Sequence, residues 1–322
     1  MSVPYALDVP RIPVGEWIED FFDWLTEDFE PFFDAIDTVT DTAVSGLATA
    51  LVAVPALVLI LAFSILALVV RSWKFGLGSL VGLGLIESMN QWVPAMETLA
   101  LVVVAAGVAV AVGIPVGVLA ARSSRVSSTV RPILDLMQTM PAFVWLVPMV
   151  TLFSIGPVAG VASTIIFALP PGVRLTELGI RQVDPEIVEA GHAFGSSPRH
   201  ILRGIQMPLA MPTIMAGVNQ VIMLALSMAV IAGLVGAGGL GGQVTTSIAR
   251  LDIGLGFEAG LSVVFLAIYL DRLTAAVGQG SHRRGWFSRR RRTPGGGQLS
   301  DETEVEVETS RSLHGTPIAG MH

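Results

Sequence analysis

The chain has 322 residues and a formal net charge of −7, and 52% of its residues are hydrophobic whereas only 14% are charged. Soluble domains carry about a quarter charged residues. This composition, with a mean hydropathy of +0.69, therefore excludes a soluble globular protein and predicts an all-α, polytopic membrane protein. The absence of cysteine excludes a disulfide scaffold, cysteine-ligated metals and thiol catalysis.

The N-terminal segment, residues 1–42, is acidic and aromatic. It contains eleven acidic residues and one basic residue, Arg11. Its apolar residues recur near helical spacing, which predicts an amphipathic helix with a break near Pro31. These apolar residues are Trp17, Ile18, Phe21, Phe22, Leu25, Phe29, Phe32 and Phe33. The pattern indicates an extracytoplasmic arm that lies on the membrane surface or touches a partner; the alternative is a solvated tail with an apolar face.

Seven apolar segments follow and are predicted to span the membrane. Their approximate ranges are 44–70, 75–93, 95–121, 133–153, 157–177, 208–235 and 255–277. The second segment is interrupted by glycines and ends in the polar run 87–90. It therefore either spans the membrane or re-enters it.

The basic residues predict the orientation. They follow the first, third, fifth and seventh segments, whereas the intervening loops hold only Arg250. Because cytoplasmic loops are enriched in Lys and Arg, we expect the N-terminus outside and the C-terminus in the cytoplasm.

The C-terminal tail, residues 278–322, begins with a basic cluster. Six arginines between residues 283 and 292 flank Trp286 and Phe287. The cluster is predicted to sit on anionic membrane lipid, or to act only as a stop-transfer signal, and residues 293–322 are predicted to be disordered. We therefore divide the chain into the acidic tail at 1–42, two N-terminal spans at 43–93, a transmembrane core at 94–277 with a cytoplasmic loop at 178–207, and this tail.

Sequence patterns that carry catalysis are missing. A phosphate loop places a lysine after a glycine-rich turn, and the only lysine, Lys74, has no such turn before it. The run 236–241 matches G-x-G-x-x-G, but it follows an apolar span rather than a strand, so we interpret it as a flexible end of the sixth span. The histidines lack zinc spacing. Glu97, Asp135 and Glu177 lie near span ends, which disfavours a proton-coupled carrier.

The segment from Asp184 to Pro208 is a polar, helix-forming loop between two apolar runs. Asp184 is predicted to cap a helix that starts at Pro185 and stops at Gly195. Ser197 is predicted to cap a second short helix that ends before Pro208. The sequence thus predicts a compact cytoplasmic pair of helices.

The first of these helices carries an apolar face. Ile187, Ala190, Gly191 and Phe194 follow helical spacing, and Glu189 stands beside them. Small residues let a short helix enter a cleft, and a charge at its edge fixes the register. The pattern favours docking of a soluble partner over a merely amphipathic surface loop.

This loop resembles the signature loop of bacterial ABC-importer permeases, which reads Glu-Ala-Ala, three residues, Gly, nine residues, Ile-x-Leu-Pro. The matching residues here are Glu189, Ala190, Gly191, Gly195, Ile205, Gln206, Met207 and Pro208. Gly191 replaces the second Ala and Met207 replaces Leu. Both replacements are small or conservative in shape, and we expect Gly191 to loosen its helix slightly.

A longer resemblance narrows the family. Segments from Thr98 to Leu101, Asp135 to Phe143, Ile166 to Pro171, Pro212 to Gln220 and Ala225 to Gly241 are similar to the glycine betaine, proline betaine and choline branch of these permeases. Together they cover about residues 95–277. The first 94 residues and the last 45 contribute little to the resemblance.

The resemblance implies the type I importer permease fold in a bacterial cell membrane. It also implies a homodimer, partner ATP-binding cassette subunits and an extracytoplasmic substrate-binding protein, with no nucleic-acid partner. ATP and magnesium would bind the partner ATPase, and this chain would bind no cofactor. Closure of the ATPases would move the coupling loop and alternate the access of the substrate path.

Candidate pathway residues follow from the quaternary ammonium substrate that the resemblance implies. Aromatic faces attract such cations, so Phe143 and Trp145 are candidates, or they pack against helices or lipid instead. Asn219, Ser227 and Met228 are further candidates.

Three alternatives remain open. In the first, the chain is an ABC permease for another small solute, such as a phosphonate, methionine or a sulfonate. In the second, it is a non-transporting osmosensor whose loop docks a signalling partner. The third, an intramembrane enzyme, is disfavoured because the catalytic patterns are missing.

Overall fold

The computed structural model describes residues 13–289, and these residues form helices and no strand. The α-helices are α1 (Val14–Asp28), α2 (Glu30–Ala53), α3 (Ala56–Val70), α4 (Trp73–Ser88), α5 (Trp92–Arg122), α6 (Ser124–Thr139), α7 (Leu146–Phe153), α8 (Pro157–Arg181), α9 (Pro185–Ala193), α10 (Pro198–Ile201), α11 (Met207–Ala232), α12 (Gly239–Arg250) and α13 (Ile253–Arg289). Short 3-10 helices, η1 (Ala142–Trp145) and η3 (Gly233–Val235), and a π-helical turn, η2 (Leu202–Gln206), complete the set. The all-α prediction is confirmed.

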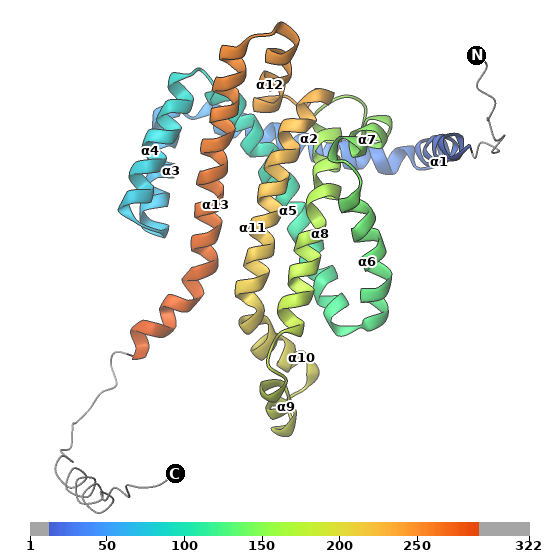
Figure 1. Cartoon of the computed structure of the whole chain (residues 1–322), viewed down its shortest axis with the longest axis vertical. Helices are drawn as coiled ribbons and strands as arrows, with labels where there is room; N and C mark the ends of the chain where they lie inside the picture. Colours follow the sequence, from blue (N-terminus) through green and yellow to red (C-terminus); the bar gives the residue numbers. More distant parts are fainter. Residues whose placement is uncertain (1–12, 290–322) are drawn as a thin grey trace, which may run out of the picture. The chain divides into compact units, whose positions relative to one another are not determined.

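Helices α5, α8 and α11 form the centre of the unit that ends at Gly280 (Figure 1). Small residues let their backbones approach closely, as is usual in membrane bundles. A Cβ on Gly117 of α5 would stand only 2.6 Å from Cβ of Thr176 in α8. The buried apolar core accordingly runs along these three helices and includes Met96, Val161 and Val221.

The number of single helices that could cross a membrane is lower than the seven spanning segments predicted. Within residues 13–289, four helices are long and apolar enough to cross a membrane: Trp92–Arg122, Pro157–Arg181, Pro198–Val235 and Ile253–Ala276. Two bent pairs raise the number to six if each pair is one span. The predicted segment 75–93 is not a single helix, because α4 has 16 residues and ends at Ser88. Its length of about 24 Å is below the thickness of the hydrocarbon core.

Two other predicted spans are broken by proline. Segment 44–70 bends by 101° between α2 and α3, and segment 133–153 bends by 106° after α6. Pro55 and Pro141 lack the N–H that would continue each helix, and they hold Val54 and Met140 in extended conformations. Each of these two predicted segments is therefore a bent pair of helices rather than one helix.

The first two helices follow the predicted amphipathic pattern. The helix breaks at Phe29, and Pro31 lies in the first turn of α2, as the sequence predicted. Helix α1 buries none of its residues, and Trp17, Phe21 and Trp24 are about half exposed. Helix α2 runs without interruption through the expected boundary at 42/43. The arginines from 290 onward and the predicted disordered tail lie outside the described residues.

The chain direction places related features at opposite ends of the central helices. Helix α5 begins beside α12, where Thr98 accepts a hydrogen bond from the Leu240 amide, and it ends beside the last turn of α8, where Arg181 donates to the Ala120 carbonyl. Figure 1 shows α9 and α10 at the end opposite to α12. The predicted cytoplasmic loop thus lies at the end where α5 and α8 finish in basic residues.

Candidate functional site

The loop between α8 and α11 folds as two short capped helices. The Asp184 side chain accepts a hydrogen bond from the Glu186 amide at 2.9 Å, and Pro185 occupies the first turn of α9. Ser197 accepts from the His200 amide at 3.3 Å, and Pro198 starts α10. These caps satisfy amides that have no partner inside a helix. Both predicted helix starts are confirmed.

Gly195 ends α9 as predicted. Its φ of +75° is the left-handed conformation that favours glycine. The Ser196 amide donates to the Gly191 carbonyl at 3.1 Å and thereby closes the helix end. The turn is tight enough for α10 to fold back onto α9.

The inner face of α9 packs on the second helix. Gly191 is buried, and a Cβ at this position would stand 3.0 Å from Cδ1 of Ile205 and 3.3 Å from Cγ1 of Ile201. Val188, one turn earlier, packs against the small cluster that contains Leu202. The substitution of Gly for the family's Ala at 191 therefore lies at the closest contact between the helices.

The outer face of α9 is apolar and exposed. Phe194 is 89% exposed and Ile187 is 44% exposed, and Glu189 and Ala190 are also exposed. The single apolar face expected from spacing is therefore divided, because Gly191 packs inward while the other three residues point outward. An exposed Phe at the tip of a short helix is typical of a surface that another protein covers.

The second helix does not end before Pro208, contrary to the prediction. Helix α10 continues through the π-helical turn η2 into α11, and together they form one helix from Pro198 to Val235. Pro208 lacks an amide hydrogen and crowds the preceding turn. A wider turn just before it lets the helix continue past the proline. Ile205 is half-buried in this turn, and Pro208 is exposed.

A buried carboxylate joins the helices above this loop. One oxygen of Glu177, Oε1, accepts from Ser127 at 2.8 Å and from Arg131 at 3.1 Å, and it forms an ion pair with Nε of Arg181 at 3.0 Å. The Glu177 side chain is only 8% exposed, so these three groups supply the partners that a buried charge requires. Arg181 also donates to the Ala120 carbonyl at 2.8 Å. The network therefore ties α5, α6 and α8 together.

This network is not predictable from the local sequence, for a physical reason. Glu177 and Arg181 stand four residues apart, a spacing that predicts a pair on one helix. Ser127 and Arg131, however, lie about fifty residues away in the chain. Nothing in the local sequence indicates that they meet the same carboxylate.

The candidate pathway residues of α11 lie at three different kinds of site. The Asn219 side chain donates to Asp271 at 2.8 Å and accepts from Thr274, both in α13. Met228 is fully buried in the core. Ser227 is exposed and donates to the Met223 carbonyl of its own helix. The three residues therefore have different surroundings within one copy of the chain.

The two aromatic candidates also lie in different surroundings. Phe143 is 60% exposed on η1. The Trp145 indole donates to the Met137 carbonyl at 3.2 Å, and its ring lines a cavity of about 720 Å³ between α1 and α7. Ile18 and Phe22 of α1 line the opposite wall. Trp145 thus faces a cavity that it shares with α1, whereas the Phe143 side chain is exposed.

The glycine-rich run 236–241 is tightly packed rather than flexible. The Gly239 amide donates to Glu97 at 3.0 Å and the Leu240 amide donates to Thr98 at 2.8 Å. These side chains of α5 cap the start of α12. A Cβ on Gly241 would stand 2.7 Å from the carbonyl oxygens of Ala229 and Val230. The glycines allow close backbone packing and leave no phosphate-binding loop.

No group of three or more His, Asp or Glu side chains within residues 13–289 is arranged to hold a metal ion.

Comparisons with known proteins agree with this architecture. Residues 113–282 match the family described as binding-protein-dependent transport system inner membrane component. The chain is 49% identical over 280 residues to the glycine betaine/proline betaine transport system permease protein ProW of Escherichia coli, covering 86% of this chain and 79% of ProW. It is 45% identical over 269 residues to the glycine betaine transport system permease protein OpuAB of Bacillus subtilis, covering 84% of this chain and 95% of OpuAB.

A solved structure supports the fold. The inward-facing MetNI methionine ABC transporter contains a chain that is similar to this one with a TM-score of 0.54. The match covers 57% of this chain and 92% of that chain, at 23% sequence identity. At this identity the likeness concerns the fold alone.

Proposed function

Because this chain belongs to the family of binding-protein-dependent transport system inner membrane components, we propose that it carries glycine betaine or a related quaternary amine across the bacterial inner membrane as the permease subunit of an ABC importer. Two relatives with 49% and 45% identity are permeases for glycine betaine. The size of this match over most of the chain supports the same substrate class here.

The exposed face of α9 carries the proposal. Phe194 and Ile187 present apolar surface at the tip of the loop, and Glu189 lies beside them. We assign this face to contact with a partner ATP-binding cassette subunit, which would bind ATP and magnesium. Burial of an exposed aromatic side chain in a partner's cleft is a strong source of binding energy.

The continuous helix from Pro198 to Val235 supplies the mechanical link. When the ATPases close, α9 and α10 move with them. Because α10, η2 and α11 form one uninterrupted helix, this motion passes into the membrane as a rigid-body shift of α11. Helix α8 receives the same motion through residues 182–184. This chain therefore needs to move, and needs no catalytic group.

A second copy of the chain and an extracytoplasmic binding protein complete the proposed assembly. A closed substrate path requires a surface on the other side of α11, and Ser227 lies exposed on this helix. Phe143, whose side chain is exposed, is the candidate for contact with the quaternary ammonium group. Asn219 is assigned to holding α11 against α13 through Asp271 and Thr274.

Uptake competition tests the substrate class. Cells that lack their own betaine carriers and express this chain with its neighbouring ATPase and binding protein should accumulate labelled glycine betaine. Unlabelled proline betaine, choline and carnitine compete in this assay if the site accepts quaternary amines in general. Competition by phosphonates, methionine or sulfonates but not by betaines would contradict the proposal. Failure of an ATPase to co-purify with this chain would contradict it as well.

A further inference from the structure

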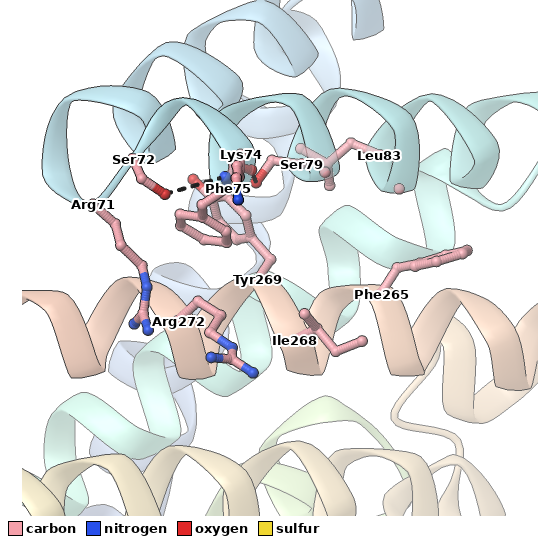
Figure 2. A pocket seen from close by; sticks show the side chains of 12 residues that line it. Arg71, Ser72, Lys74, Phe75, Ser79, Leu83, Phe265, Ile268, Tyr269 and Arg272 are labelled. Atoms are coloured by element: carbon pink, nitrogen blue, oxygen red, sulfur yellow. Dashed lines mark hydrogen bonds between the residues drawn. The ribbon is translucent and has the colours of Figure 1, made fainter.

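A cleft of about 390 Å³ lies between the α3–α4 hairpin and α13, remote from the coupling loop. Its floor is aromatic: Phe75 and Tyr269 stack with ring centres 5.9 Å apart, and the Tyr269 hydroxyl donates to the Phe63 carbonyl at 3.2 Å. Figure 2 shows α4 along one wall and α13 along the other. The hairpin is thus fixed to α13 at one end of the cleft, and the space beyond that contact remains open.

One end of the cleft is strongly basic. Arg71 and Lys74 come from the hairpin turn, and Arg272 comes from α13. In Figure 2 the side chains of Arg71 and Arg272 extend toward the same end of the cleft. No acidic residue is among the described residues that line it.

The nearby partners of these cations are weak. Arg272 approaches Asp271 through Nε at 3.7 Å, and the other oxygen of Asp271 accepts from Asn219. Lys74 lies 6.0 Å from the centre of the Trp73 ring, a contact of small energy at an exposed site. The cleft therefore carries an excess of positive charge.

Apart from Ser72 and Ser79, the rest of the cleft and its surroundings are apolar. Gly78, Gly82, Leu83 and Ile268 continue the cleft along α4 and α13. The outer faces of the hairpin are also apolar: Leu61, Ile65, Val69, Leu77 and Val81 are each more than half exposed. Such faces require lipid around them. Cations beside lipid-exposed helices are stable when they pair with an anion or reach the head-group layer.

We propose that this cleft binds one anionic glycerophospholipid. The phosphate lies between Arg71 and Arg272, with Lys74 beside it, and one acyl chain lies in the channel along Gly78 and Ile268. Basic pockets between membrane helices suit anionic head groups, and here apolar residues of α4 and α13 line the same cleft as the cations. The bound lipid fills the space between the hairpin and α13, and its phosphate offsets part of the positive charge of the cleft.

Native mass spectrometry of the full-length protein, purified in mild detergent and supplied with phosphatidylglycerol, tests the proposal. Wild-type protein should retain phosphatidylglycerol in preference to phosphatidylcholine. The double variant Arg71→Gln/Arg272→Gln should bind it roughly 25-fold more weakly, at about fivefold for each cation. The matched control is Arg125→Gln, because Arg125 is an exposed cation that does not line the cleft; it should bind as wild type does.

The apolar channel is tested separately. A Cβ on Gly78 meets no atom within 4 Å, so Gly78→Leu fills the channel without disturbing the helix and should reduce phosphatidylglycerol binding while all three cations remain. Gly84→Leu is the matched control, because Gly84 has equal space on the same helix but lies outside the cleft. Equal retention of phosphatidylcholine by wild-type protein, or undiminished phosphatidylglycerol binding by the double variant, would overturn the proposal. Inorganic phosphate that binds equally to wild type and Gly78→Leu and displaces the lipid would assign the site to a soluble anion instead.

Discussion

Gly191 of α9 lies against Ile205 of η2 so closely that a Cβ at position 191 would stand 3.0 Å from Cδ1 of Ile205. Ile205 belongs to the helix that continues to Val235. The outward-facing residues of α9 are therefore attached directly to the element that enters the membrane. We therefore expect a displacement of α9 at Phe194 to be transmitted to α11 through this contact and through the α9–α10 turn.

The loss of uptake and of stability on substitution of Gly191 should increase with the size of the new side chain. Gly191→Ala places a methyl group against the far end of a flexible isoleucine side chain, and it removes a helical glycine that costs up to about 1 kcal/mol relative to alanine. Uptake should remain near the wild-type rate. Gly191→Leu should separate α9 from η2, destabilise the loop by about 1–3 kcal/mol and abolish uptake. Labelled-betaine uptake and thermal melting of the purified protein measure both effects; equal behaviour of the two variants would show that the contact does not transmit motion.

Charge reversal at Glu189 should break docking without harming the fold. Glu189 is exposed on α9, so Glu189→Lys leaves the helix packing intact and changes only the charge that the proposed ATPase partner would meet. Uptake should be lost, while membrane insertion and the melting temperature stay at wild-type values. Glu189→Gln, which removes the charge without reversing it, should retain part of the uptake. If Glu189→Lys transports normally and still co-purifies with the ATPase, α9 is not the docking helix.

The effect of a substitution at Gly195 should depend only on how well the new residue tolerates the left-handed backbone conformation. Its φ is +75°, and a Cβ there meets no atom within 4 Å, so any cost arises from the left-handed conformation. Asparagine tolerates this conformation, whereas β-branched residues do not. Gly195→Asn should keep most of the uptake, and Gly195→Val should lose it, with a cost of about 1–2 kcal/mol. Uptake rates that fail to follow this order would mean that α9 does not depend on this turn.

The carboxylate of Glu177 should contribute to the stability of the whole bundle. Glu177→Ala leaves three donors without their acceptor and should destabilise the protein by about 2–3 kcal/mol, below the usual cost of a fully buried pair because Arg131 is 61% exposed. Arg131→Gln should cost under about 1 kcal/mol. Arg181→Gln should cost more, since Arg181 also donates to the Ala120 carbonyl. Thermal melting in detergent gives the ranking, and a larger loss from Arg131→Gln than from Arg181→Gln would contradict it.

The sequence was sufficient to predict those features that arise locally. The caps at Asp184 and Ser197, the stop at Gly195 and the break near Pro31 all follow from short-range chemistry, and all are present. Apolar length likewise predicted the helices α5, α8 and α11. The basic residues predicted one orientation, and the chain direction in the bundle agrees with their grouping at one end; the orientation itself stays a prediction.

Features that depend on tertiary contacts were not predictable. The bends at Pro55 and Pro141 were not predicted, because hydropathy gives the length of an apolar run and not its direction. Pro208 was expected to end a helix, but a π-helical turn relieves its clash. The capping of α12 by Glu97 and Thr98 joins residues 142 positions apart, and no local pattern encodes that distance.

The glycine-rich segment after α11 offers a final test. The sequence predicted a flexible end of the sixth span here, whereas the backbones of α11, η3 and α12 pack closely together. A Cβ on Gly233 would collide with the backbone of Gly241, and a Cβ on Gly241 would stand 2.7 Å from two carbonyl oxygens of α11. Gly241→Ala should therefore force the two backbones apart, destabilise the protein by about 1–3 kcal/mol and reduce uptake.

Gly242 provides the control for this packing. It follows Gly241 directly in α12, and a Cβ there meets no atom within 4 Å, so Gly242→Ala should be neutral or stabilising by up to about 1 kcal/mol. Thermal melting of both variants separates close packing from helix propensity. If the run acts as a hinge, both alanines should leave the melting temperature unchanged and reduce uptake equally. If it is a packed joint, only Gly241→Ala lowers the melting temperature, and transport falls with it.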